Sequence, residues 1–220
     1  MSVELKKRII TSFFLLILLV LMFLYTFVLI IAIITIAVIA WIEFYALISK
    51  IFIKKKNKDK NLRFFCKAIS LLYLFYLIYL IMIMKTTNPD LSIILIYSIF
   101  ISIMSDVGGL VIGKIFKGKK LSKISPNKTI SGSVGSFMSS LLLIPFFNEY
   151  MPNYHLQSLI LFTIIISLTS QLGDLFISYT KRRANVKNTS DLLPGHGGIL
   201  DRIDGIIFAI PMSFLLFTLF

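Results

Sequence analysis

The feature that most limits the fold of this chain is a long apolar stretch near its amino terminus. No charged residue occurs between Ile9 and Trp41, and about 20 apolar residues are enough for one helix to cross a bilayer. The stretch is also far longer than the apolar region of a signal peptide, which has roughly 7–15 residues. We therefore predict two membrane-spanning helices here, with the turn between them near Tyr25 and Thr26.

Further apolar segments follow along the rest of the chain, separated by charged or turn-forming residues. Of the 220 residues, 57% are hydrophobic, which excludes an ordinary soluble domain. We predict an all-α polytopic membrane protein with about seven transmembrane helices. It is expected to be one integral membrane domain, residues 1–220, with N-terminal helices in 1–90 and a catalytic part in 91–220. The third to seventh spans are expected at Phe64–Met84, Leu91–Ile112, Gly132–Phe147, Leu156–Tyr179 and Ile203–Phe220.

The basic residues lie almost entirely on one side of this predicted topology. The net charge is +13, and 22 of the 23 lysines and arginines lie in residues 1–8, 50–67, 114–128 and 181–202, before span 1 and around the junctions of spans 2 and 3, 4 and 5, and 6 and 7. The exception is Lys85. The positive-inside rule then places the N-terminus and these loops in the cytoplasm. Because no basic domain exists outside the membrane loops, we expect anionic lipid headgroups rather than nucleic acid as partners. The single cysteine, Cys66, excludes an internal disulfide.

Charged residues are concentrated between Gly173 and Gly205, where two apolar spans are joined. Ionisable groups at a membrane are costly to keep, so this concentration indicates function. If the preceding helix continues to Arg183, the spacing of three and four residues places four polar side chains on one face. These are Asp174, Ser178, Lys181 and Arg182.

A glycine-rich loop and a pair of acids complete this stretch. The run PGHGG at 194–198 predicts a tight loop whose backbone amides approach a ligand closely. Its His196 either shapes the loop over a nucleotide or is a turn histidine bonded to backbone. The next helix begins with Asp201 and Arg202, and its carboxylates at Asp201 and Asp204 share a face. They are either a helix cap with an Arg202 salt bridge or, with the nearby cations, a site for a Mg²⁺-bound polyphosphate.

A second informative stretch covers residues 113–136, which contain six lysines among glycines and serines. Lysines in such a loop suit phosphate binding, although the loop lacks the Walker A pattern. The candidate residues are Ser125, Lys128 and Thr129. Asp106, near the end of the fourth span, is hard to explain as packing, and we expect it to line the same cavity without assigning it a role.

The two stretches together resemble the signature of the phosphatidate cytidylyltransferase (CDP-diacylglycerol synthase) family. The first block matches an Asp followed by small residues, Gly-Lys, a lysine-rich turn and Ser-Pro-x-Lys-Thr. One position of the second block departs, because the family usually has Asp where this chain has Asn188, which puts a metal role there in doubt. A weaker likeness covers the N-terminal Lys-Lys-Arg-Ile and Trp41-x-Glu43, and we expect a reduced version that lacks some early helices. The matching residues of the second block are Ser178-x-x-Lys181-Arg182, Lys187, and Pro194-Gly195-His196-Gly197-Gly198-x-Leu200-Asp201-Arg202-x-Asp204.

The resemblance implies transfer of CMP from CTP to phosphatidic acid, giving CDP-diacylglycerol and pyrophosphate. The active site would lie at the cytoplasmic face of a multi-pass protein of the bacterial inner membrane. Mg²⁺ is the implied cofactor, and the need for a second, monovalent cation stays open. Asp174 and Asp201 are assigned to the metal. Asp204 is either a third carboxylate ligand or a residue that supports the metal ligands without contacting the metal. The assigned phosphate, nucleotide and loop residues are Lys181, Arg182, Arg202, Lys187, Ser125, Lys128, Thr129, Ser178, His196, Gly197 and Gly198.

Other interpretations stay open at this stage. A related enzyme that uses CTP on a polyprenyl or other lipid phosphate would share these motifs, whereas the pattern of CDP-alcohol phosphatidyltransferases is missing. A small transporter would carry its charges near mid-membrane. A Gly132-x-x-Gly135 face would suit a homodimer. Glu43 is either a lone acid at the membrane interface, which we favour, or a partner of the site.

Overall fold

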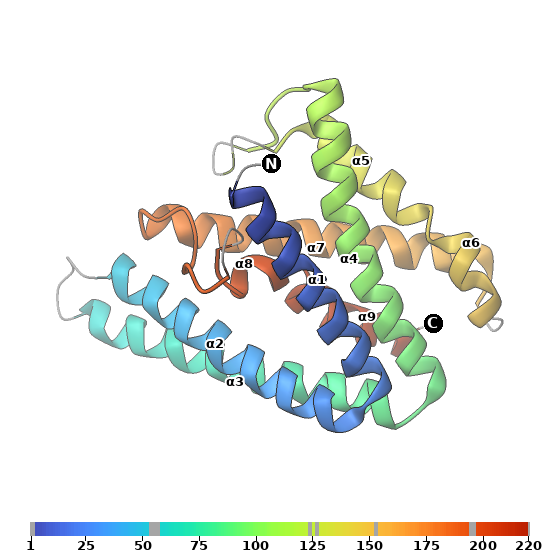
Figure 1. Cartoon of the computed structure of the whole chain (residues 1–220), viewed down its shortest axis with the longest axis horizontal. Coiled ribbons are helices and arrows are strands. Elements are labelled where there is room, and N and C mark those ends of the chain that lie inside the picture. The colour runs from blue at the N-terminus through green and yellow to red at the C-terminus, as the bar shows by residue number, and fades with distance from the viewer. Residues whose placement is uncertain are drawn as a thin grey trace. The chain divides into compact units, whose positions relative to one another are not determined.

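The structure is a computed structural model that describes residues 3–52, 58–122, 125, 128–151, 154–193 and 197–219. Within these ranges it contains helices and two isolated β-bridges but no β-strand. The elements are shown in Figure 1. They are α1 (Val3–Leu24), α2 (Thr26–Ile51), α3 (Lys58–Thr86), α4 (Pro89–Phe116), α5 (Ile130–Leu141), α6 (Ile144–Phe147), the 3₁₀ helix η1 (Asn148–Tyr150), α7 (Leu156–Arg183), α8 (Leu200–Ile203) and α9 (Ile206–Leu219).

The helices confirm the predicted class of all-α polytopic membrane protein. In the described part of the chain, six segments are long and apolar enough to cross a membrane, and a shorter apolar helix covers Phe13–Leu24. The first two helices are separated at Tyr25, which has an extended backbone, so the predicted turn is confirmed although neither Gly nor Pro marks it. The six segments are Thr26–Ile51, Lys60–Thr86, Pro89–Phe116, Ile130–Tyr150, Leu156–Arg183 and Leu200–Leu219.

Two of the predicted spans are interrupted rather than continuous. The fifth is divided between α5 and α6 by a turn at Leu142 and Leu143, and Pro145 lies in the first turn of α6. The seventh is divided between α8 and α9 by a turn at Asp204 and Gly205. The prediction that Asp201 and Asp204 open one continuous helix is therefore wrong.

The chain divides into two compact units. Unit 1 comprises residues 1–78 and 180–203, and unit 2 comprises residues 79–179 and 204–220. Helices α3 and α7 continue from one unit into the other. Each unit is therefore assembled from segments that are distant in the sequence.

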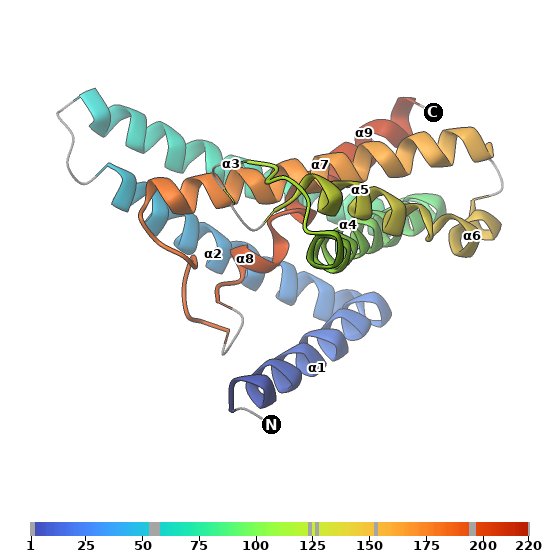
Figure 2. The same ribbon diagram turned by 90° about the horizontal axis from the view of Figure 1, so that it is seen from above.

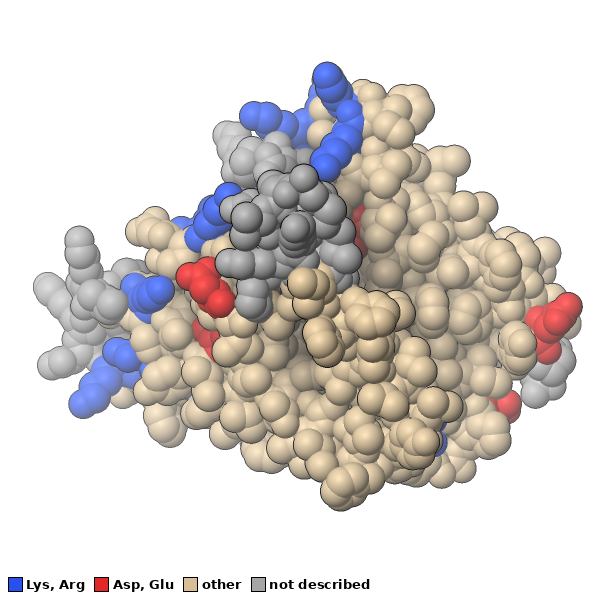
Figure 3. Space-filling model, viewed as in Figure 1, with Lys and Arg blue, Asp and Glu red and all other residues tan. Residues whose placement is uncertain are grey.

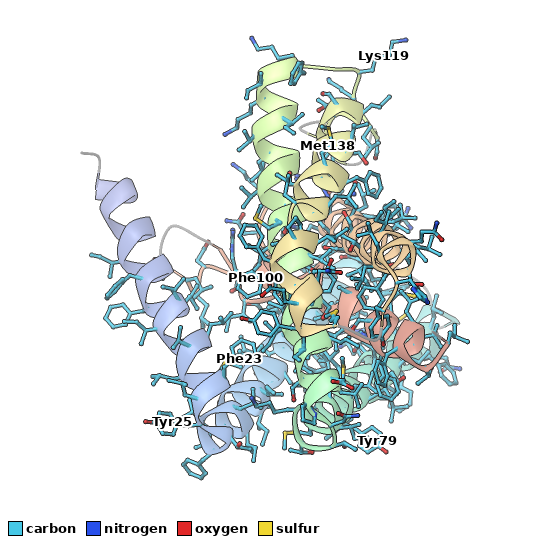
Figure 4. All side chains as sticks on the ribbon, turned by 90° about the vertical axis from the view of Figure 1, so that its right-hand side faces the viewer. Phe23, Tyr25, Tyr79, Phe100, Lys119 and Met138 are labelled. Atoms are coloured by element: carbon cyan, nitrogen blue, oxygen red, sulfur yellow. The ribbon has the colours of Figure 1, made fainter. Side chains whose placement is uncertain are left out.

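Unit 1 is built on the hairpin of α1 and α2, which turns at Tyr25 (Figures 1 and 4). The first part of α3 packs against the second half of α2, where the indole Nε1 of Trp41 donates to the carbonyl oxygen of Lys67 at 3.4 Å. The α2 face that contains Leu47 and Ile48 is buried. Segment 180–203 adds the end of α7 and the loop that leads into α8.

Unit 2 is organised by the close packing of α4 against α5, which lie side by side in Figures 1 and 2. A Cβ added at Gly108 of α4 would lie 1.6 Å from Oγ of Ser139 on α5, so the helices approach where side chains are absent. Oγ of Ser136 donates to the carbonyl oxygen of Ser105 at 2.7 Å across the same interface. Close approach of small residues is the usual way in which helices associate in membranes.

The glycine pair that suggested a homodimer is used inside the chain. A Cβ at Gly132 would lie 2.8 Å from the carbonyl oxygen of Gly109, and one at Gly135 would lie 2.5 Å from Cβ of Ile112. Both glycines of α5 are buried against α4. This face therefore gives no support to a homodimer.

Candidate active site

The carboxylate of Asp201 has polar contacts with three residues from different parts of the chain, Lys181, Thr189 and Gly198. Its Oδ1 accepts a hydrogen bond from Nζ of Lys181 at 2.6 Å, and the side chains of the pair are 7% and 12% exposed. Its Oδ2 accepts from the backbone nitrogens of Thr189 at 2.9 Å and Gly198 at 3.1 Å, and lies 3.0 Å from Oγ1 of Thr189. The carboxylate at the start of α8 therefore joins the end of α7 to both sides of the connecting loop.

The residues on either side of 194–196, a segment of the PGHGG run that lies outside the described residues, are joined through the backbone. Leu193 and Gly197 exchange both backbone hydrogen bonds, at 2.8 and 3.1 Å. Gly197 has φ +83°, a backbone conformation that L side chains rarely adopt. His196, predicted to shape the loop, lies outside the described residues.

The second acid of this cluster is Glu43 of α2, which is 4% exposed. Its carboxylate lies among hydroxyl and backbone groups of the loop between α7 and α8. The favoured interpretation of Glu43 as a lone interfacial acid is therefore wrong, and the alternative of a partner of the site agrees with these contacts. The sequence signals were a single Glu in an apolar helix and the weak likeness at Trp41-x-Glu43, and neither identified the loop as its partner.

Unit 2 contains a separate ion pair between two predicted site residues. The ammonium of Lys128 contacts Oδ2 of Asp174, and Oγ of Ser178, one turn further along α7, donates to Oδ1 of the same carboxylate at 3.2 Å. The Lys128 and Asp174 side chains are 27% and 21% exposed. Since α7 is one helix through Arg183, the predicted extension of this helix and the proximity of Asp174 and Ser178 are confirmed.

The connection between α4 and α5 has its own short backbone scaffold. The nitrogen of Leu121 donates to the carbonyl oxygen of Lys128 at 2.8 Å, and the nitrogen of Ile130 donates to that of Lys119 at 2.9 Å. Thr129 caps α5, because its side chain accepts from the nitrogen of Gly132 at 3.0 Å. Lysines extend outward at this end of unit 2, with Lys119 at the tip (Figures 3 and 4).

Thr129 was predicted to bind phosphate, and its hydroxyl also lies 3.0 Å from Oγ of Ser131. Its capping role explains its residue type without a ligand, whereas its predicted contact with phosphate stays a prediction. Ser125 is partly buried, and its carbonyl oxygen accepts from the nitrogen of Lys128 at 3.1 Å. This contact holds the Ser-Pro-x-Lys turn closed.

The remaining candidates differ in exposure. Three of the cations that were predicted around phosphate are exposed, as expected for groups that meet a ligand from solution: Arg182, Lys187 and Arg202. Asn188, where the family usually has Asp, is exposed too. Asp204, in unit 2, is 6% exposed, and its Oδ1 accepts from the nitrogen of Gly205 at 3.0 Å. Asp106 is exposed on α4 next to buried Ser105, so its predicted place in a cavity stays a prediction.

The acids suit Mg²⁺ in their donor chemistry, though not as a preformed cage. Within the described ranges, no three His, Cys, Asp or Glu side chains converge as a metal site would require. Mg²⁺ is commonly held by one or two carboxylates while phosphates and water supply the other oxygens. Asp201 in unit 1 and Asp174 in unit 2 each already contact a lysine ammonium, which a metal would have to displace. Asp201 has three further contacts to hydroxyl and backbone donors, whereas among the described groups Asp174 has only one, from Ser178, so Asp174 is the better fit for a metal that arrives with a polyphosphate.

Comparison with known proteins agrees with the signature residues. The sequence model of the Cytidylyltransferase family matches residues 3–220, which is nearly the whole chain. The chain belongs to the Cytidylyltransferase family. Both blocks of candidate residues fall within the matched range.

Curated relatives of this chain include bacterial proteins named phosphatidate cytidylyltransferase. One from Rickettsia felis is 40% identical over 142 residues, which cover 60% of this chain and 61% of the relative. One from Staphylococcus haemolyticus is 40% identical over 122 residues, which cover 54% and 46%, and one from Staphylococcus aureus (strain COL) is 41% identical over 131 residues, which cover 58% and 50%. The chain thus spans about half to three fifths of the length of these curated relatives.

Proposed function

We propose that this membrane protein transfers CMP from CTP to phosphatidic acid and forms CDP-diacylglycerol and pyrophosphate. The observation that carries the proposal is the convergence of Lys181, Gly198 and Asp201, three signature residues from separate parts of the second block. Membership of the Cytidylyltransferase family and the names of the curated relatives support the same reaction. Their bacterial sources support the bacterial inner membrane as the location.

The reaction is a displacement at phosphorus. A phosphate oxygen of phosphatidic acid forms a bond to the α-phosphorus of CTP, and the bond from that phosphorus to the oxygen that bridges to the β-phosphate breaks. Pyrophosphate leaves with the electron pair of that bond. The nucleophile already carries negative charge, so the site needs no strong general base, and catalysis depends on positioning and charge neutralisation.

The residues of the chain have distinct parts in this proposal. The Lys181 ammonium is held by Asp201 and would face the phosphate groups, while the exposed Arg182, Lys187 and Arg202 would supply further positive charge. In unit 2, Lys128 beside Asp174 would bind phosphate in the same chemical manner. A bound Mg²⁺, held by Asp201 or Asp174 with Asp204 as a further acid, would polarise the phosphate oxygens.

The experiment is an assay of the purified full chain reconstituted in lipid vesicles. Pyrophosphate release from CTP is measured with Mg²⁺, with and without phosphatidic acid, and CDP-diacylglycerol is identified by mass spectrometry. The proposal requires release that depends on both Mg²⁺ and phosphatidic acid. Release that depends on a polyprenyl phosphate instead would assign a different lipid substrate. Uptake of a solute into the vesicles without turnover would refute an enzymatic function.

A further inference from the structure

The first inference concerns Glu43, whose carboxylate is completely occupied by the loop between α7 and α8. Its Oε1 accepts from Oγ of Ser190 at 2.6 Å and from the nitrogen of Ile199 at 3.1 Å. Its Oε2 accepts from Oγ1 of Thr189 at 2.8 Å and from the nitrogen of Leu200 at 2.9 Å. A carboxylate offers about four acceptor positions, so these four donors use all of them.

These donors flank Asp201 on both sides. Ile199 and Leu200 directly precede Asp201, and Thr189 donates its backbone nitrogen to Asp201. The single hydroxyl hydrogen of Thr189 lies within reach of two carboxylate oxygens, at 2.8 Å from Glu43 and 3.0 Å from Asp201. A shift of Glu43 would therefore be transmitted to Asp201 through a hydroxyl and through the adjacent backbone.

Gly198 shows that the loop is shaped around this carboxylate. A Cβ at Gly198 would lie 2.5 and 2.6 Å from the two Glu43 oxygens and 1.9 Å from Oγ1 of Thr189. The glycine leaves the space that the acid fills. In the described part of the chain, no lysine or arginine forms an ion pair with Glu43. The acid therefore acts on backbone amides and hydroxyls rather than as a charge partner.

We infer that Glu43 is a positioning residue, which fixes Asp201 and the glycine loop in the geometry used for CMP transfer. Its effect on turnover rests on the proposed function, whereas its effect on the loop does not. Buried polar groups whose acceptors are all satisfied hold one arrangement and disfavour others. Replacement of groups that orient a metal or its ligands typically costs about 10–100-fold in affinity or activity.

The test compares Glu43→Gln with Glu149→Gln, which changes an exposed acid in η1 to an amide. The amide nitrogen introduced by Glu43→Gln would face one hydroxyl, which can rotate to accept, and one backbone N–H, which cannot, so at least one of the four bonds is lost. Hydrogen–deuterium exchange is measured on the full chain in detergent, together with kcat and KM for pyrophosphate release. We expect faster exchange at Ile199 and Leu200, unchanged exchange in α4, and a fall in kcat of about 10–100-fold with little change in KM.

The outcomes separate the role of Glu43 from the proposed function. Unchanged exchange at Ile199 and Leu200 would overturn the inference, and so would faster exchange with full activity. If the parent protein releases no pyrophosphate but exchange still rises in Glu43→Gln, the proposed function fails and the positioning of Asp201 stands. Should Glu43→Gln not fold, Thr189→Val against Thr189→Ser gives the same comparison, because only the serine retains the hydroxyl between the two acids.

A second, independent inference concerns two cations that converge on one neutral hydroxyl. Arg63 Nη2 donates to Oγ of Ser49 at 3.0 Å, and Nζ of Lys67 donates to the same oxygen at 2.8 Å. Lys67 is 9% exposed, and its ammonium lies 3.1 Å from the ring centroid of Tyr45. Oγ of Ser49 donates to the carbonyl oxygen of Tyr45 at 2.8 Å, so its one hydrogen is already used.

Two cations meet at Ser49 without a described carboxylate beside them. Among the side chains that the structure describes, which do not include that of Asp59, neither Arg63 nor Lys67 forms an ion pair with a carboxylate. A buried charge is costly unless it is paired, and the Tyr45 ring compensates an ammonium only in part. Two like charges that share one hydroxyl also repel each other. A phosphate oxygen would accept from both groups and offset their charges.

We propose that Ser49, Arg63 and Lys67 form a phosphate-binding site between the ends of α2 and α3. Arginine and lysine are the usual partners of phosphate groups. The chemistry fits either the headgroup of an anionic lipid or free inorganic phosphate, and basic clusters next to membrane helices attract anionic lipids.

The test measures the melting temperature of the full chain in nanodiscs of phosphatidylcholine, in nanodiscs with added phosphatidylglycerol, and in detergent with inorganic phosphate. We expect phosphatidylglycerol or inorganic phosphate to raise the melting temperature, and Arg63→Gln and Lys67→Gln to remove most of the rise. The matched control is Lys50→Gln, which removes an exposed charge from the same end of α2. An equal loss in Lys50→Gln, or no rise with any phosphate compound, would overturn the proposal. A rise with phosphatidylglycerol alone identifies a lipid site, and a rise with inorganic phosphate identifies a site for the free anion.

Discussion

Replacement of Gly198 by alanine tests the centre of unit 1 most directly. The added Cβ would lie 1.9 Å from Oγ1 of Thr189 and 2.5 Å from Oε2 of Glu43, whereas ordinary contacts of a Cβ begin at 3.4 Å. Gly198 is not among the glycines with positive φ, so alanine meets no backbone strain there. The cost is therefore steric, and it falls on buried groups that have no free space to enter.

The magnitude follows from the hydrogen bonds that must break. Oγ1 of Thr189 would have to retreat by about 1.5 Å to reach ordinary contact, which removes its bond to Glu43 or to Asp201. A hydrogen bond to a charged group contributes about 1.5–3 kcal/mol. With a partial loss at Glu43 as well, we expect the loop to open more easily by about 2–4 kcal/mol, which corresponds to roughly 30- to 1000-fold faster amide exchange.

The assay is hydrogen–deuterium exchange of peptides that cover 189–201, with pyrophosphate release measured on the same samples. Gly197→Ala is the matched control, because its φ of +83° makes backbone strain the main cost there, about 1–2 kcal/mol. Steric origin also predicts non-additivity: in a Glu43→Ala background, Gly198→Ala should add much less than it does alone. Parent-like exchange at Ile199 and Leu200 in Gly198→Ala would refute the described packing of Glu43 against the loop.

Three other substitutions give distinct results. Asp201→Asn is expected to abolish CMP transfer while the protein still elutes as a folded species from a sizing column in detergent, and full pyrophosphate release would contradict its proposed role. Lys128→Gln should lower the free energy of unfolding by only about 0–1 kcal/mol, because the ion pair of Lys128 with Asp174 is partly exposed. Its larger effect is expected on the KM for CTP, which a melting curve and a CTP titration test together. Gly108→Ala should lower the melting temperature clearly, because its Cβ would lie 1.6 Å from Oγ of Ser139 and 2.7 Å from the carbonyl oxygen of Gly135; an unchanged melting temperature would show that α4 and α5 are not in this close contact.

The helices could be predicted from the sequence because membrane length and hydrophobicity decide them locally. The turn at Tyr25 follows from the length of the apolar run alone, since one helix of that length exceeds a bilayer. The extension of α7 to Arg183 follows from polar residues spaced by three and four. The turns at 142–143 and 204–205 could not be predicted in this way. At the second turn the packing is close, since a Cβ at Gly205 would lie 2.3 Å from Oγ of Ser170.

The sequence predicted which residues belong to the candidate site better than it predicted which of them contact each other. The signature contains Lys181, Gly198 and Asp201, but neither spacing nor composition shows that Lys181 pairs with Asp201 rather than with Asp174. Glu43 and Leu200 are separated by more than 150 positions, and contacts at that distance leave no periodic pattern. Thr129 is a different case, because its role as the N-cap of α5 is a local signal in the sequence. The lysines around it favoured the prediction of phosphate binding instead.

In unit 1, hydrogen bonds to two acids hold the loop before α8 in place. Thr189, Ser190 and Gly198 of this loop bury little apolar surface, so apolar packing contributes little to their order. Hydrogen bonds to Glu43 and Asp201 hold these residues instead. Seven donor groups, one from Lys181 and six from residues 189–200, point to the two acids. Loss of one acceptor leaves several buried donors without partners at once, which costs more than loss of one donor. Substitutions at Glu43 should therefore disturb the loop more than substitutions at Ser190 or Thr189, although all of them lie in the same cluster.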